Sequence, residues 1–346
     1  MSINVTNGSL TVTTIDENQW VYDLAARFTS IAYLFTGVLM FVGNMALFYP
    51  IVYHKALRSR KEYLGIAGLG LADGLNGLGY FTAAVWRIPR SMLYGSNTNA
   101  LGLTSFGCAL MPFNLLWNAF YLSAGLMLCV TSLDRLLITV TTMWYINKDT
   151  TMTQVFVAIV YAHSFGFALV AMLTGYLMRF DGPVETDMCW QNDAMWPAVY
   201  SYMLQVSSKA HIMSIVIFFF AFVAYVYHNR KVAQNTGSGV APQAAKLQKD
   251  MTIRMAWSTL ATLLFVVIPT EIADRLWADY SSMAGVLYVP PTLNPLFNVY
   301  LFLIKHKLMR KALRKALVRK KMPIHLKDWA DKITTGQKTV PSVKPN

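Results

Sequence analysis

Long runs of apolar residues, separated by short polar stretches, dominate this chain. A bilayer core about 30 Å thick needs roughly 20 mainly apolar residues for each crossing helix. Seven runs are long enough, at residues 28–53, 63–86, 105–139, 154–178, 198–228, 251–275 and 283–304. The second run is rich in glycine, and the seventh contains prolines. The pattern predicts an all-α membrane protein, folded as a seven-transmembrane helix bundle.

The segments outside these runs set the predicted domain organisation. We expect an extracellular N-terminal tail over residues 1–27, a seven-transmembrane domain over 28–304, and a disordered cytoplasmic tail over 322–346. In residues 305–321, apolar side chains recur every three to four positions among Lys and Arg. This spacing is typical of an amphipathic helix that lies on a membrane surface.

Composition and charge agree with a membrane protein and indicate its orientation. The chain has 346 residues, is 55% hydrophobic and only 14% charged, whereas soluble domains carry roughly 25% charged residues. The net charge of +13 comes largely from Lys and Arg in the first and third loops and in the tail from Lys305 to Lys344. The positive-inside rule then places the C-terminus in the cytoplasm. Because these charges lie beside the spans, we expect inner-leaflet lipid as a partner and no nucleic acid.

The predicted extracellular side carries two kinds of covalent site. Asn4 and Asn7 each begin an Asn-X-Ser/Thr glycosylation sequon ahead of the first span. Cys108 lies at the outer end of the third span and Cys189 in the loop after the fourth. Both thiols are on the oxidising side of the membrane, where a disulfide can persist. The alternative is two free extracellular thiols.

Several predicted spans contain polar residues, which are costly in a membrane and usually face the interior of a bundle. These residues are Asn44, Asp73, Asp134, Arg135, Lys209, His211 and Asn294. Pro269 interrupts the sixth span and Pro295 the seventh.

The order of these residues resembles the rhodopsin-like G-protein-coupled receptors from residue 28 to residue 317. The matching residues are Asn44 in span one, Leu71-Ala72-Asp73 in span two, Asp134-Arg135 closing span three, Pro269 in span six and Asn294-Pro295 in span seven. The form Asp-Arg-Leu-Leu is most similar to nematode serpentine chemoreceptors, such as the Srsx-like group. The resemblance implies a receptor that activates a heterotrimeric G protein.

The resemblance also implies roles for the residues at the cytoplasmic side. Arg135 would pair with Asp134 at rest and contact the G protein in the active state; the alternative is an interfacial arginine that anchors its helix. Asp250, at the inner foot of span six, could also pair with Arg135 at rest. Asn294 and Pro295 would form a hinge in span seven.

In the middle of the bundle, Asn44, Asp73 and Asn294 would form a polar cluster that compensates for Pro295. A purely structural hydrogen-bond cluster is the alternative. Pro290 and Pro291 replace polar residues that help to hold sodium in the family, which argues against sodium at Asp73. We therefore expect no metal, and no cofactor.

Three further departures from the family limit what carries over. Asn298 stands where the span-seven motif ends in tyrosine, and Val267 stands where the family has the tryptophan of span six. Cys108 lies two residues further from Arg135 than is usual, which indicates a bulge or a shifted helix start.

Five residues are candidates for ligand binding: Lys209, His211, Trp117, Tyr121 and Glu271. Lys209 could recognise an acidic ligand, or it could extend along span five towards the membrane surface. The aromatic residues could line the pocket or only pack the bundle. Glu271, Asp274, Arg275, Arg87 and Arg90 flank the outer ends of spans six and two. We expect them to be solvated loop charges, and the alternative is that they rim the pocket.

We therefore expect a chemosensory receptor for a small extracellular molecule, located in the plasma membrane, with sensory cilia as a candidate site. Amine receptors of this family need an acid in the outer half of span three, where Trp117 stands instead. Visual pigments need a span-seven lysine, and Tyr288 occupies that place. A neuropeptide-type receptor and a seven-span ligand-gated ion channel are the alternatives. We do not expect an enzyme, because no HExxH, GxSxG or facing carboxylate pair is evident.

Overall fold

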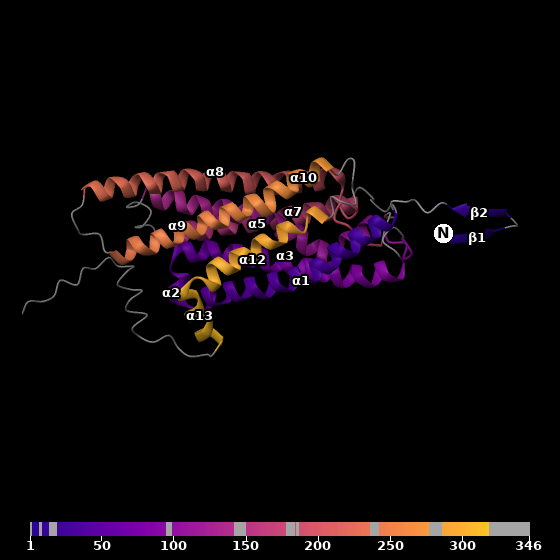
Figure 1. Cartoon of the computed structure of the whole chain (residues 1–346), viewed down its shortest axis with the longest axis horizontal. Helices are drawn as coiled ribbons and strands as arrows, with labels where there is room; N and C mark the ends of the chain where they lie inside the picture. Colours follow the sequence, from indigo (N-terminus) through magenta and orange to yellow (C-terminus); the bar gives the residue numbers. More distant parts are fainter. Residues whose placement is uncertain are drawn as a thin grey trace, which may run out of the picture.

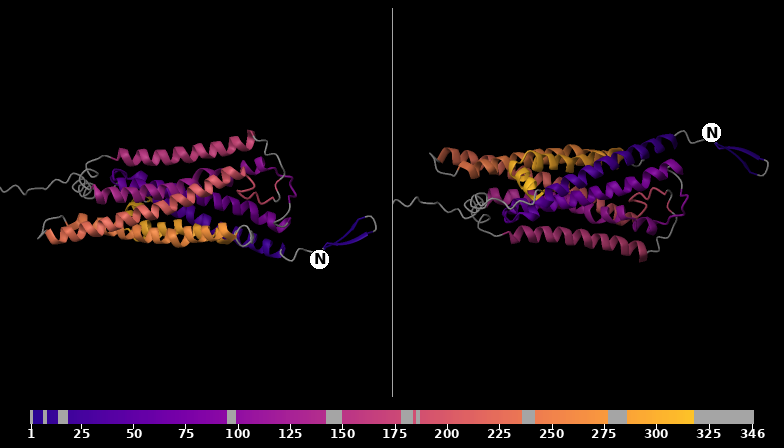
Figure 2. Two further views of the ribbon diagram at one scale, coloured as in Figure 1. Left: turned by 90° about the horizontal axis from the view of Figure 1, so that it is seen from above. Right: turned by 90° about the horizontal axis from the view of Figure 1, so that it is seen from below.

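A computed structural model shows a bundle of long helices that run back and forth along one axis (Figures 1 and 2). It describes residues 2–6, 9–13, 19–94, 99–141, 150–177, 184, 187–235, 242–276 and 286–317. Within these ranges, the side chains of residues 2–22, 228–251, 274, 276 and 315–317 lie outside the description.

The helices correspond to the seven predicted spans and their connections. They are α1 (Gln19–Tyr53), α2 (Lys55–Arg58), α3 (Lys61–Leu93), α4 (Ser105–Ala109), α5 (Pro112–Val140), α7 (Thr151–Leu177), α8 (Pro197–Asn235), α9 (Pro242–Thr262), α10 (Ile268–Leu276), α12 (Leu293–Val299) and α13 (Lys307–Leu317). Two π-helical turns, η1 (Leu263–Val267) and η3 (Tyr300–Ile304), and one 3₁₀ turn, η2 (Pro290–Thr292), complete the sixth and seventh spans. Strands β1 (Ser2–Thr6) and β2 (Ser9–Thr13) pair antiparallel ahead of α1.

The predicted all-α bundle is confirmed, with the small N-terminal hairpin as an addition that the apolar pattern did not indicate. Five helical segments in the described ranges are long and apolar enough to cross a membrane. They are Asp23–Tyr53, Pro112–Val140, Thr151–Leu177, Pro197–Tyr227 and Thr252–Ala273. The two remaining spans, α3 and α12 with η3, are the glycine-rich and proline-containing segments.

Helix boundaries differ from the sequence prediction in two places. The first helix begins at Gln19 rather than at residue 28, so part of the predicted tail is helical. The third span is not one continuous helix from Ser105: α4 ends at Ala109 and α5 begins at Pro112. Proline is well suited to the first turn of a helix, where its missing N–H has no partner to lose. This break accounts for the unusual spacing between Cys108 and Arg135.

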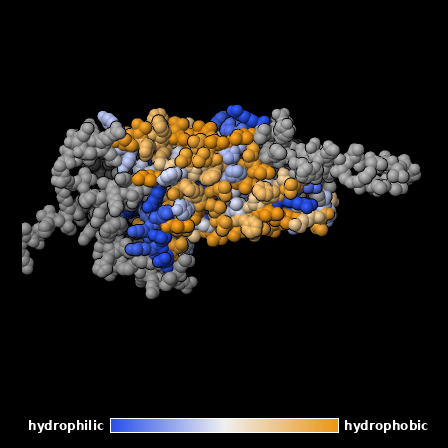
Figure 3. Space-filling model, in the orientation of Figure 1, coloured by the Kyte–Doolittle hydropathy of each residue, from blue (hydrophilic) through white to orange (hydrophobic). Residues whose placement is uncertain are grey.

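The two ends of the bundle differ in chemistry. The disulfide end carries the N-terminus of α1, α4 and the Cys108–Cys189 bridge, and the basic end carries α2, α13, the end of α8 and the start of α9 (Figure 1). Between them, hydrophobic residues form a broad band on the visible surface (Figure 3). Phe219 and Leu169, both more than half exposed, belong to the apolar outer surface of α8 and α7. An apolar band of this kind suits the hydrocarbon core of a bilayer.

Two buried histidines attach α13 to the bundle at the basic end. His54 Nε2 lies 2.9 Å from the carbonyl oxygen of Ala312, in a hydrogen bond between the α1–α2 junction and α13. His306 accepts a hydrogen bond from the backbone N–H of Met309 at 3.4 Å, and its Nε2 lies 3.3 Å from the hydroxyl of Tyr63. The charged side of α13 is therefore held at a fixed place beside α1 and α3.

Glycine allows α1 and α3 to pack closely at their crossing. A Cβ atom at Gly77 would lie 2.5 Å from Cβ of Met40 and 2.9 Å from the backbone nitrogen of Phe41. A Cβ atom at Gly37 would lie 2.8 Å from the backbone oxygen of Gly77. Small residues bring membrane helices together in this way, because the gain is van der Waals contact between backbones.

We expect Gly77→Ala to destabilise the protein by about 1–3 kcal/mol, because the added methyl group forces backbone apart. Gly166→Ala is the matched control, since a Cβ atom at Gly166 on α7 meets nothing within 4 Å. Thermal denaturation of the two purified variants in detergent measures the difference. Equal melting temperatures would show that the α1–α3 crossing is not tightly packed.

Candidate functional site

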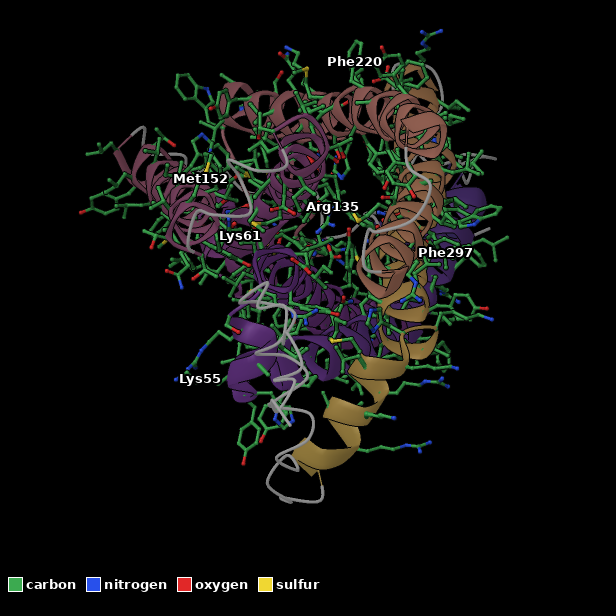
Figure 4. All side chains as sticks on the ribbon, turned by 90° about the vertical axis from the view of Figure 1, so that its left-hand side faces the viewer. Lys55, Lys61, Arg135, Met152, Phe220 and Phe297 are labelled. Carbon is green, nitrogen blue, oxygen red and sulfur yellow. A yellow bond between two sulfur atoms is a disulfide. The ribbon has the colours of Figure 1, made fainter. Side chains whose placement is uncertain are left out.

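At the basic end, Arg135 forms an ion pair with its neighbour on α5. Nη2 of Arg135 lies 2.9 Å from Oδ2 of Asp134, and both residues are buried. Viewed along the axis from this end, Arg135 lies inside the bundle, whereas Lys55 and Phe220 lie at its periphery (Figure 4). Glu62 and Met255 border the same small cavity. The side chain of Asp250 lies outside the described residues, so a contact with Arg135 stays a prediction.

The expected central cluster of three polar residues is not joined by hydrogen bonds in the structure. Asn44 donates to the backbone oxygen of Met40 on its own helix at 2.9 Å. Oδ1 of Asn44 and Oδ2 of Asp73 are both buried and have no hydrogen-bond partner among the described residues. Asn294 instead accepts a hydrogen bond from Thr262, at 3.3 Å. In the part of the chain that the structure describes, Asn44 and Asp73 are thus not hydrogen-bonded to Asn294.

The polar contacts of span seven are made with span six. Besides the Thr262–Asn294 bond, Ser258 Oγ donates to Oδ1 of Asn298. All four residues are buried, and the two bonds are one helical turn apart on each helix. Asn298, noted in the sequence only as a departure from the family motif, is therefore a bridging residue between α9 and α12.

At the disulfide end, the Cys108–Cys189 bridge is formed and joins α4 to the loop after α7. Arg87 of α3 lies beneath this loop and is fully buried, so the interpretation of Arg87 as a solvated loop charge was wrong. Its Nε and Nη2 atoms donate to the carbonyl oxygens of Met188 and Cys189, at 2.9 and 3.2 Å. Its guanidinium lies over the ring of Trp190, 4.0 Å from the centroid. Sequence gave no signal for this burial, because the loop that covers Arg87 is a hundred residues away.

The loop above Arg87 contains an unusual backbone conformation. Cys189 has a φ of 47°, in the left-handed region that residues other than glycine seldom adopt. Asn114 of α5 donates to the carbonyl oxygen of Cys189 in this loop, at 3.4 Å, and to that of Cys108 at 2.8 Å. The loop is thus fixed by hydrogen bonds as well as by the disulfide.

A larger cavity, of about 530 Å³, lies between α8 and α10 in the half of the bundle nearer the disulfide end. Its charged lining residues are Lys209 and Glu271, two of the five predicted ligand-binding residues. Ser208 Oγ donates to Oε1 of Glu271 at 3.1 Å, which ties α8 to α10. Gln205 and Ser208 were not predicted, although their spacing with Lys209 places all three on neighbouring positions of one helix face.

The other three predicted ligand residues do not line this cavity. Trp117 is buried in an aromatic cluster, 5.2 Å from the ring centroid of Tyr80 and over the guanidinium of Arg87. His211 is buried, and its Nδ1 lies 2.7 Å from the backbone oxygen of Ser207. Tyr121 packs with apolar residues of α5, α7 and α8. Their periodicity in the sequence could not distinguish packing from pocket lining.

Comparison with known proteins adds a family to this geometry. The family model described as "7 transmembrane receptor (rhodopsin family)" matches residues 43–296. A search of the curated proteins finds no match.

We expect Arg87→Met to lower stability by about 2–4 kcal/mol, because two buried carbonyl groups lose their donor and the ring contacts are lost. Arg90→Met, one turn further along α3, is the matched control: Arg90 lies over Trp86 at 4.1 Å and should cost no more than about 1 kcal/mol. Thermal denaturation in detergent compares the two. A loss at Arg90 as large as that at Arg87 would contradict the anchoring role of Arg87.

Proposed function

Because the chain belongs to the rhodopsin family of seven-transmembrane receptors, we propose that it is a chemosensory receptor that binds a small extracellular molecule and activates a heterotrimeric G protein. One observation carries the proposal. The helix formed by α9, η1 and α10 borders the 530 Å³ cavity through Glu271 and the small cavity beside Arg135 through Met255. The sixth span thus borders both a cavity large enough for a small ligand and the cavity beside Arg135.

The dimensions of the cavity favour a small molecule as ligand. Sites for such ligands usually enclose roughly 300–1,000 Å³ and combine apolar walls with a few polar groups. The cavity between α8 and α10 fits this description, with Leu204 and Ile212 among its apolar residues. A peptide ligand would need a more extended surface, so the cavity supports the chemosensory proposal, as does the resemblance to nematode chemoreceptors.

The sixth span has features that suit a moving element. A π-helical turn at Leu263–Val267 lies directly before Pro269, and such turns are frequent at functional sites. The Ser258–Asn298 and Thr262–Asn294 bonds connect this helix to α12. We propose that a ligand between α8 and α10 biases the position of the sixth span, and that α12 follows through these bonds.

At the basic end, movement of the sixth span would open a groove beside Arg135. An amphipathic G-protein helix could then occupy that groove. In this proposal Arg135 leaves Asp134 to contact the G protein, and α13 lies on the inner leaflet. The disulfide end faces outwards, with glycans on Asn4 and Asn7. Asn7 is outside the described residues, and Asn4 belongs to β1. The concentration of Lys and Arg at the basic end supports this orientation in the plasma membrane.

We expect Arg135→Ala to abolish G-protein activation while the protein still reaches the cell surface. Lys55→Ala is the control, because Lys55 is an exposed cation at the same end of the bundle. The measurement is a promiscuous G-protein reporter, screened with volatile and acidic small molecules, beside surface labelling. Unchanged signalling by the Arg135 variant would refute its role, and a response confined to peptides would refute the chemosensory proposal.

We expect an epitope tag at the N-terminus to bind antibody on unpermeabilised cells, and a C-terminal tag to bind only after permeabilisation. The positive-inside distribution of Lys and Arg is the physical reason. The reverse result would exclude the proposed orientation and would favour the ion-channel alternative.

A further inference from the structure

The cavity between α8 and α10 contains two opposite charges. Lys209 comes from α8 and is exposed to the cavity, and Glu271 comes from α10 and is half-buried. Both residues fall inside segments that are long and apolar enough to cross a membrane. Ionisable groups in such segments are costly, and they usually pair with one another or with a ligand.

Neither charge is neutralised by the protein in the part of the chain that the structure describes. Nζ of Lys209 donates to Oε1 of Gln205 at 3.3 Å, and Glu271 accepts from Ser208 at 3.1 Å. Both partners are uncharged. Lys209 and Glu271 therefore line one cavity without forming an ion pair with each other or with any other described residue.

A ligand with a single charge would leave the other group without compensation. A bound carboxylate would neutralise Lys209, but it would add a second negative charge to the cavity that holds Glu271. A bound amine would do the converse. Only a molecule with both charges compensates the two groups together, and ionisable groups within membrane-spanning segments usually have such compensation.

We propose that this cavity binds a zwitterionic small molecule, with its carboxylate at Nζ of Lys209 and its ammonium group at the carboxylate of Glu271. The proposal rests on the proposed receptor function, since it identifies the ligand class of the same site. Leu204 and Ile212 provide apolar wall for the carbon chain between the charges, and Ser201 and Gln205 provide further polar groups. Arg275, exposed on the same helix, does not line the cavity.

The test uses the full-length protein in lipid nanodiscs and the ω-amino acids from glycine to 6-aminohexanoate. This series varies the separation between ammonium and carboxylate, and pentylamine and pentanoate are the singly charged controls. We expect at least one amino acid to raise the melting temperature in a concentration-dependent manner. The singly charged compounds should need a concentration roughly tenfold or more higher, equivalent to about 1.4 kcal/mol. A zwitterion no better than pentanoate or pentylamine, or no stabilisation by any probe, would overturn the proposal.

Variants then assign the two charges. Lys209→Met and Glu271→Gln should each remove the advantage of the zwitterion, whereas Arg275→Gln should retain it. The exchanged double variant, Lys209→Glu with Glu271→Lys, should restore binding, because an ω-amino acid can bind in the reverse direction. Loss in both single variants without recovery in a folded double variant would refute the charge assignment. So would single variants that melt early while the zwitterion has no effect on the unmodified protein, because the two groups would then stabilise only the fold.

A negative result here can be distinguished from a failure of the proposed receptor function, because the melting temperature is measured without a G protein. Stabilisation by a zwitterion without reporter activity would support the binding site and count against G-protein activation. Reporter activity for neutral or singly charged compounds, with no stabilisation by zwitterions, would support the receptor and overturn the ligand class.

Discussion

A helix that crosses a bilayer must satisfy its own backbone hydrogen bonds, because the hydrocarbon core has no water to bind them. The same constraint applies to the polar side chains of the spans. Threonine hydroxyls in the spans donate to carbonyl oxygens of their own helices, at Thr36, Thr82, Thr131, Thr174 and Thr270. The winding changes near two of the prolines, with a π turn ahead of Pro269 and a 3₁₀ turn ahead of Pro295, whereas Pro50 and Pro89 lie inside the α-helices α1 and α3. These threonine hydroxyls are thus satisfied within their own helices and, among the described residues, make no bond to a neighbouring helix.

The few polar contacts between helices therefore have a large influence on how the helices are rotated. Ser132 and Ser214 bond at 2.8 Å between α5 and α8, and the hydroxyl of Tyr161 donates to the backbone oxygen of Gly68 at 2.7 Å. The Ser258–Asn298 bond joins α9 to α12. Between these contacts, packing of small and apolar residues is less directional. Span six is joined to span seven by side chains that could bond in more than one arrangement, which suits a receptor with two states.

Two cations in the same half of the bundle have different environments, and the contrast explains their different proposed roles. Arg87 has a planar group with several donors, which carbonyl oxygens and aromatic rings of the covering loop satisfy in part. Lys209 carries a compact charge in an open cavity, and among the described residues its Nζ atom donates to Gln205. Arg87 thus contributes to the stability of the disulfide end, whereas the charge of Lys209 remains accessible to a ligand.

The sequence was sufficient for the features that follow from one helix at a time. Long apolar runs predicted the bundle, because a membrane crossing requires length and apolarity whatever its neighbours are. The ordered motifs around Asp73, Arg135 and Pro295 indicated the family for the same reason, since each is local. The break at Leu110–Met111 and the early start of α1 were less accessible, because helix ends depend on capping and on contacts with other segments.

Which side chains meet was decided only by the tertiary structure. Periodicity places a residue on a face of its own helix, but it does not fix how that helix is rotated or where it crosses its neighbour. Lys209 and Glu271 share a cavity, Trp117 and His211 do not line it, and Arg87 is buried by a loop distant in sequence. Each of these outcomes depends on contacts between segments far apart in the chain, and the order of residues along one helix contains no information about them.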